Sequence, residues 1–123
     1  MAVPRISKED LKQRLDSAEP PVLLDVRLKY PFEHSTLKLP GAIRLNPGAI
    51  DSSPLPRDRE IVLYDSDPGE LVSERIGADL IRRGFRALAL EGGIGDWVTA
   101  KLPTETKPAP QSAATAAAAT PKG

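Results

Sequence analysis

The segment from residue 60 to residue 90 constrains the fold more than any other part of the chain. It begins with EIVLY (60–64), a β-branched and apolar run bounded by charged residues, which predicts a buried strand. Ile76 and Leu80 then lie one helical turn apart and predict an amphipathic helix. FRALAL (85–90) predicts a second strand. Strand, helix and strand in this order favour a parallel pair joined by a right-handed crossover.

Shorter patterns on both sides extend this arrangement. Ser7 is a suitable N-cap for a helix over residues 8–18. PPVLLDV (20–26) predicts a buried strand, and LPGAIRL (39–45) predicts a turn followed by a short strand. IGDWVTAKL (94–102) predicts a last helix, with its tryptophan in the core. We therefore expect an α/β protein whose mainly parallel sheet is covered by helices on both faces.

The charge balance and the length bound the classes of function. Lys plus Arg equals Asp plus Glu, at 17 each, so no charge excess attracts nucleic acid or an anionic membrane. The first residues lack the apolar run of a signal peptide, and no apolar stretch could span a bilayer. We expect a cytoplasmic protein without nucleic-acid or membrane partners. One domain over residues 1–104 is predicted, followed by a disordered Ala- and Pro-rich tail over residues 105–123.

Polar residues follow the ends of three predicted strands. Asp25 and Arg27 lie at the end of the first strand. Asp65 follows the second strand, and Glu91 follows the third. The carboxyl ends of parallel strands share one edge of a sheet, where ligands bind, so this edge is the candidate site. We expect Asp25 and Arg27 to support it by hydrogen-bonding neighbouring loops.

Four segments, in this order and spacing, resemble the rhodanese-like domain family: LLDVR (23–27), LPGAIRL (39–45), IVLYDSDPGELVSERIGADLIRRGF (61–85) and LEGGIGDW (90–97). The resemblance covers almost all of residues 4–103 and implies a five-stranded, mainly parallel sheet with helices on both faces. Active members of the family are sulfurtransferases, which carry sulfane sulfur from donors such as thiosulfate on a cysteine persulfide. Related members use the same cysteine in phosphatase or arsenate reductase chemistry.

The chain departs from the family at the reacting residue. The family's nucleophile is the first residue of the loop after the central strand, and here that residue is Asp65. The sequence contains no cysteine and cannot carry a persulfide. The active-site-like loop consists of Asp65, Ser66, Asp67, Pro68, Gly69 and Glu70. The segment LKYPFEHSTLKLPGA (28–42) is also longer than usual, and we assign no function to its Glu33 and His34.

We predict a catalytically inactive domain that lacks thiosulfate sulfurtransferase activity and acts as a binding or regulatory module. No residue is assigned a catalytic role, and no cofactor or metal is expected. The sequence leaves room for a protein partner but does not identify one. A carboxylate at position 65 can accept the loop's own N–H groups, occupy the anion site itself and repel external anions. Asp67, Pro68 and Glu70 predict a capping box that starts the following helix.

Other interpretations stay open. Asp65 could be a neutral replacement in a purely structural domain. It could instead be the nucleophile of a divergent hydrolase or phosphotransferase, as in haloacid-dehalogenase sites, although the short chain after Asp67 lacks their later motifs. Sulfurtransferase-related activity could also persist only in a partner or homologue. A calcium loop is excluded because Ile76 stands where the required glutamate would be, and a loose Mg²⁺ site lacks further ligands.

Overall fold

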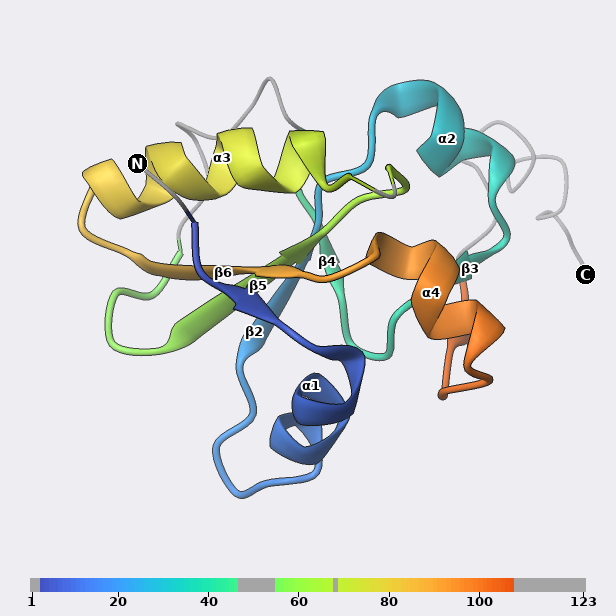
Figure 1. Ribbon diagram of the computed structural model, residues 1–123, viewed down its shortest axis with the longest axis horizontal. Helices are drawn as coiled ribbons and strands as arrows, with labels where there is room; N and C mark the ends of the chain where they lie inside the picture. Colours follow the sequence, from blue (N-terminus) through green and yellow to red (C-terminus); the bar gives the residue numbers. More distant parts are fainter. Residues whose placement is uncertain (1–2, 47–54, 68, 108–123) are drawn as a thin grey trace, which may run out of the picture.

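A five-stranded sheet forms the centre of the computed structural model, which describes residues 3–46, 55–67 and 69–107. The strand order is β1-β6-β5-β2-β4, and all neighbouring strands are parallel (Figure 1). The strands are β1 (Arg5–Ile6), β2 (Val22–Asp25), β4 (Ile43–Arg44), β5 (Glu60–Tyr64) and β6 (Arg86–Leu90). The α/β architecture with a five-stranded parallel sheet is therefore confirmed.

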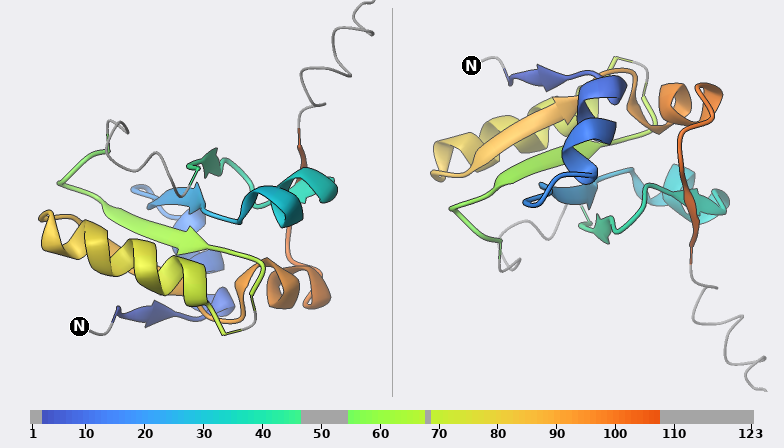
Figure 2. Two further views of the ribbon diagram at one scale, coloured as in Figure 1. Left: turned by 90° about the horizontal axis from the view of Figure 1, so that it is seen from above. Right: turned by 90° about the horizontal axis from the view of Figure 1, so that it is seen from below.

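Helices cover both faces of this sheet. The helices are α1 (Lys8–Leu15), α2 (Lys29–His34), α3 (Leu71–Arg82) and α4 (Gly93–Thr99). In Figure 1, α3 lies above the sheet and α1 below it, and Figure 2 shows the two faces separately. The alternation of β5 explains this, because Ile61 and Leu63 pack with α3 while Val62 and Tyr64 pack on the opposite side. Trp97 is fully buried on that opposite side, as predicted.

Four short elements were not predicted. Strand β1, helix α2 and the antiparallel pair β3 (Leu37–Lys38) with β7 (Glu105–Thr106) are too short to show a hydrophobic period. Helix α1 also ends at Leu15, earlier than the predicted residue 18. Because β7 pairs with β3, the described structure continues beyond the domain boundary expected at residue 104. Residues 108–123 lie outside the described residues, so the disordered tail stays a prediction.

The carboxyl ends of β5 and β6 meet closely at one edge of the sheet. The N–H of Ile94 donates to the carbonyl oxygen of Asp65 at 3.0 Å. Gly93, one residue earlier, has a φ of 64°, and a Cβ placed on it would lie 2.4 Å from that same oxygen. Position 93 therefore requires glycine for its backbone conformation and for the close approach.

We predict that Gly93→Ala lowers the free energy of unfolding by roughly 2–4 kcal/mol, since left-handed strain and a backbone clash act together. Gly95→Ala is the matched control. Gly95 lies in the same helix, a Cβ placed on it would have no neighbour within 4 Å, and alanine should stabilise the helix by about 0.5–1 kcal/mol. Urea denaturation followed by circular dichroism measures both changes. Equal effects of the two substitutions would contradict the close approach at Gly93.

Candidate functional site

The Asp65 carboxylate is buried at the start of α3 and hydrogen-bonded by the backbone of its own loop. Its side chain is 1% exposed. Oδ2 accepts the N–H of Ser73 at 2.7 Å, and Oδ1 accepts the N–H of Asp67 at 3.0 Å. Ser73 lies in the first turn of α3, where N–H groups lack partners within the helix and the helix dipole favours negative charge. Asp65 thus occupies the N–H cradle that the loop forms.

Burial raises the pKa of the Asp65 carboxyl above its ordinary value. The hydrogen bonds from the backbone of Ser73 and Asp67 act in the opposite direction, because they stabilise the ionised form. The effect of burial on the pKa is larger than the effect of these hydrogen bonds, so the pKa is raised overall. The carboxylate is therefore held by directed donors in a place that disfavours charge.

This arrangement bears on the chemistry open to Asp65. A nucleophilic carboxylate must present an oxygen to the substrate. Both Asp65 oxygens already accept backbone N–H groups, and the side chain is shielded from solvent. The geometry therefore disfavours direct attack on an external phosphate ester.

The capping box predicted for this helix is wrong in its register. Helix α3 begins at Leu71, and Glu70 precedes it with a φ of 57° and no side-chain cap hydrogen bond. Asp67 Oδ2 instead accepts the N–H of Leu71 at 3.0 Å, so this carboxylate still stabilises the helix start. Pro68, predicted as the first helical residue, lies outside the described residues. In the predicted box the Glu70 side chain would accept the N–H of Asp67, but Asp65 Oδ1 accepts that N–H instead, and Glu70 bonds Arg5 and Gly92.

The Glu70 side chain links two distant parts of the chain to the loop. It is 10% exposed and forms an ion pair with Arg5 in β1. Its Oε2 also accepts the N–H of Gly92, in the turn between β6 and α4, at 3.1 Å. Both partners are far from Glu70 in sequence, so a local pattern such as S-x-x-E could not identify them. Glu70 fixes the loop against the neighbouring strand ends.

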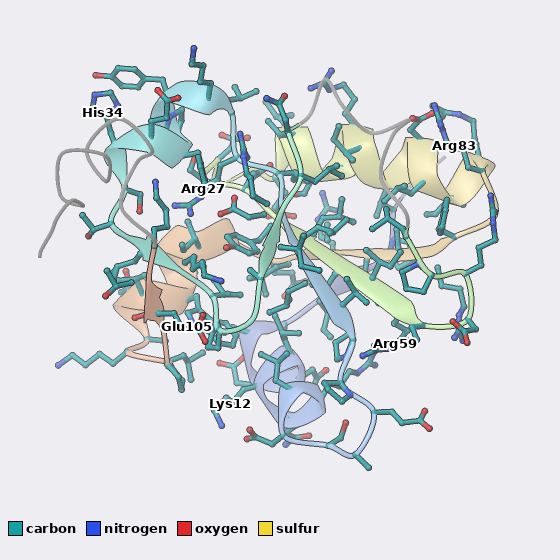
Figure 3. The ribbon with its side chains drawn as sticks, turned by 180° about the vertical axis from the view of Figure 1, so that it is seen from behind. Lys12, Arg27, His34, Arg59, Arg83 and Glu105 are labelled. Atoms are coloured by element: carbon teal, nitrogen blue, oxygen red, sulfur yellow. The ribbon has the colours of Figure 1, made fainter. Side chains whose placement is uncertain are left out.

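Asp25 and Arg27 form a buried ion pair beside the loop. Each side chain is 1% exposed, with Nε–Oδ1 and Nη2–Oδ2 distances of 2.9 and 2.6 Å. Arg27 also donates to the carbonyl oxygen of Leu37 in strand β3 at 3.0 Å. Figure 3 shows Arg27 between α2 and the end of the sheet.

Tyr64 completes this network and was missed by the sequence analysis. Its hydroxyl donates to Asp25 Oδ2 at 3.1 Å and accepts the N–H of Leu39 at 3.2 Å. Burial, followed by the charge of Asp25, raises the pKa of Tyr64, so it stays a neutral donor. A signal was available, because Asp25 and Tyr64 close neighbouring strands and pair in register. Within the described residues, the Asp65 network and the Asp25 network share no hydrogen bond. They are connected only by the peptide bond between Tyr64 and Asp65.

The remaining candidates lie apart from these networks. His34 is exposed at the end of α2, and its Nδ1 lies 3.0 Å from the carbonyl oxygen of Tyr30. The Glu91 side chain is exposed, while its N–H donates to the carbonyl of Ile6. No group of three or more His, Asp or Glu side chains that could hold a metal ion occurs within residues 3–46, 55–67 and 69–107. Over the same ranges, no helix has the length and apolar character needed to cross a membrane.

Comparison with known proteins gives consistent matches. Residues 7–100 match the rhodanese-like domain family. A sulfurtransferase from Allochromatium vinosum is 35% identical over 104 residues, which cover 82% of this chain and 94% of that protein. A tRNA sulfurtransferase from Desulfurococcus amylolyticus is 36% identical over 73 residues, which cover 59% of this chain but only 14% of the relative. A solved protein from Lactobacillus plantarum superposes with a TM-score of 0.76 at 25% identity, covering 84% of this chain and 88% of that one.

We predict that Asp65→Ala lowers the free energy of unfolding by about 1–3 kcal/mol, because it leaves the buried Ser73 N–H without its acceptor. Asp67→Ala removes one hydrogen bond at the more exposed helix start and should cost about 1 kcal/mol or less. Urea denaturation monitored by the single tryptophan, Trp97, measures both. A larger loss for Asp67→Ala than for Asp65→Ala would contradict this ranking.

The stability of the wild type relative to Asp65→Asn should decrease as pH rises through the acidic range. The raised pKa means that folded Asp65 holds its proton more tightly than the unfolded chain, whose Asp titrates near about 3.9. The resulting stabilisation is complete below the unfolded pKa and is lost as pH rises through the folded pKa. Urea midpoints of both proteins, measured from about pH 3 to about pH 7, test the sign. A difference that grows with pH would show that hydrogen bonding outweighs burial at Asp65.

Proposed function

We propose that this chain, which belongs to the rhodanese-like domain family, is a catalytically inactive member that acts as a binding or regulatory module. The observation that carries the proposal is the Asp65 carboxylate. It stands at the position of the family's sulfur-carrying cysteine, and its two oxygens accept the N–H groups of Asp67 and Ser73. The cytoplasmic location expected from the composition is part of the same proposal.

The absence of a thiol supports the loss of sulfur transfer. The relatives from Allochromatium vinosum and Desulfurococcus amylolyticus are described as a sulfurtransferase and a tRNA sulfurtransferase. Sulfur transfer through a persulfide requires a thiolate nucleophile, and this sequence has no cysteine. A carboxylate cannot replace the thiolate in that step.

Hydrogen bonds and exposed side chains of the described loop residues support a role in binding. Asp65 accepts the N–H groups of Asp67 and Ser73, and Glu70 accepts the N–H of Gly92, through buried or partly buried hydrogen bonds. Ser66 is exposed at its tip, and Leu71, which follows it, is 69% exposed although apolar. A segment already held by such hydrogen bonds loses less conformational entropy when a protein partner binds. The loop is therefore the surface that we assign to such a partner.

The first test is the production of thiocyanate from thiosulfate and cyanide. We expect no turnover by the wild type above the blank. Turnover that survives purification and is retained by Asp65→Ala would overturn the proposal, because it would show sulfur transfer without any residue at the nucleophile position.

The second test restores the missing thiol. We expect Asp65→Cys to take up sulfane sulfur from thiosulfate, seen as a mass gain of one sulfur atom, since the N–H groups at the start of α3 lower the pKa of a thiol placed there. Asp67→Cys introduces one thiol two residues away and should remain unmodified under the same conditions. Equal modification of the two variants would indicate that position 65 is not the nucleophile position of this loop.

A further inference from the structure

Three cationic side chains surround the ring of Phe32 in α2. The Arg44 guanidinium carbon lies 4.1 Å from the ring centroid, Lys107 Nζ lies 4.0 Å from it, and the Arg27 guanidinium carbon lies 5.3 Å from it. Arg27 follows β2, Arg44 belongs to β4, and Lys107 follows β7. The three residues are therefore brought together only in the folded protein. We call Phe32, Arg27, Arg44 and Lys107 the Phe32 cluster.

The Phe32 cluster has more positive than negative charge nearby. Arg27 is matched by Asp25 in the buried ion pair, and Arg44 reaches the same carboxylate only at 3.9 Å. Arg44 and Lys107 otherwise donate to main-chain carbonyl groups, namely those of Asp25, Arg27 and Phe32. Carbonyl groups are neutral and do not balance a full charge. In the part of the chain that the structure describes, Glu33 is the other acid whose charge acts on both cations, and it is exposed.

The pKa values of Lys107 and Arg44 are lowered in this surplus of positive charge. Burial lowers the pKa of Lys107, and the charges of Arg27 and Arg44 lower it further. Arg44 also has a lowered pKa, caused by burial first and opposed by Asp25. A bound anion would offset this mutual repulsion. The Arg44 side chain is 25% exposed and Lys107 is partly exposed, so an anion from solution can reach both, whereas Arg27 is enclosed.

The Phe32 ring holds the Arg44 and Lys107 cations near each other. The faces of an aromatic ring attract cations, and its edge carries partial positive charge. Because Arg44 and Lys107 lie about 4 Å from one centroid, they are at most about 8 Å apart. The hydrogen bonds of Arg44 within the described residues all come from Nη1, which leaves Nε and Nη2 of its planar fork for an acceptor with two oxygens.

We propose that Arg44 and Lys107, beside the Phe32 ring, bind a small doubly charged oxyanion of the sulfate or phosphate class. Arg44 donates two hydrogen bonds from its fork, and Lys107 donates one from its ammonium group. The site is separate from the Asp65 loop, so it stands or falls independently of the proposed function.

The test is a titration of the ¹⁵N-labelled full chain with sodium phosphate, and separately with sodium sulfate, against sodium chloride of equal ionic strength. We expect saturable shifts of the backbone N–H signals of Phe32, Arg44 and Lys107 with either dianion. Lys107→Gln should weaken the affinity about tenfold, because it removes a charge-assisted hydrogen bond. Lys107→Arg keeps the charge and should retain binding.

Lys29→Gln is the matched control, because it removes one exposed positive charge from the same helix α2 without touching the ring. Arg44→Gln should weaken binding more than Lys107→Gln, because it removes two donors, but Lys107→Gln is decisive because Lys107 lies beyond the last strand. Equal affinities for Lys107→Gln and Lys29→Gln would overturn the site. So would the absence of saturable shifts, or shifts confined to residues 65–73. Acetate that binds as tightly as phosphate would overturn the assignment to doubly charged oxyanions.

Discussion

The buried ion pair of Asp25 and Arg27 is the interaction on which this end of the molecule depends. Removing two charges from water is costly unless every remaining donor and acceptor is satisfied. Tyr64 and the carbonyl of Leu37 supply those partners, and they come from β5 and β3. The requirement to satisfy one pair of charges therefore fixes the ends of two central strands and the small β3–β7 sheet relative to one another. Arg44 and Phe32 then pack around the same pair.

The backbone of the Asp65 loop is held independently of the side chain at position 65. Its backbone is held by contacts that do not involve the side chain of residue 65, namely the N–H of Ile94 on the Asp65 carbonyl and the Glu70 bond to Gly92. The side chain then satisfies the free N–H groups of the loop and of α3. The carboxylate thus supplies acceptors for donors that the rest of the loop leaves unpaired.

The sequence predicted the elements whose apolar residues repeat at a regular period. It did not predict contacts between residues far apart in the chain. The long elements β5 and α3 were identified because apolar residues repeat along them. The interaction of Asp65 with the loop donors followed from its place after a central strand. Glu70 was misassigned because its partners, Arg5 and Gly92, are brought to it only by the sheet order. Short elements such as α2, which positions Phe32, have no repeat that a sequence pattern could reveal.

The pairing of β3 with β7 has a consequence for how the molecule folds and opens. Leu37 and Thr106 are far apart along the chain, so closing this small sheet costs about 1 kcal/mol more chain entropy than joining β5 to β6. Only two residues on each side contribute to it. Such an element forms late and exchanges its amide hydrogens through local opening, while the central strands stay closed. Lys107 follows directly after β7, so the Phe32 cluster is complete only when β7 has paired with β3.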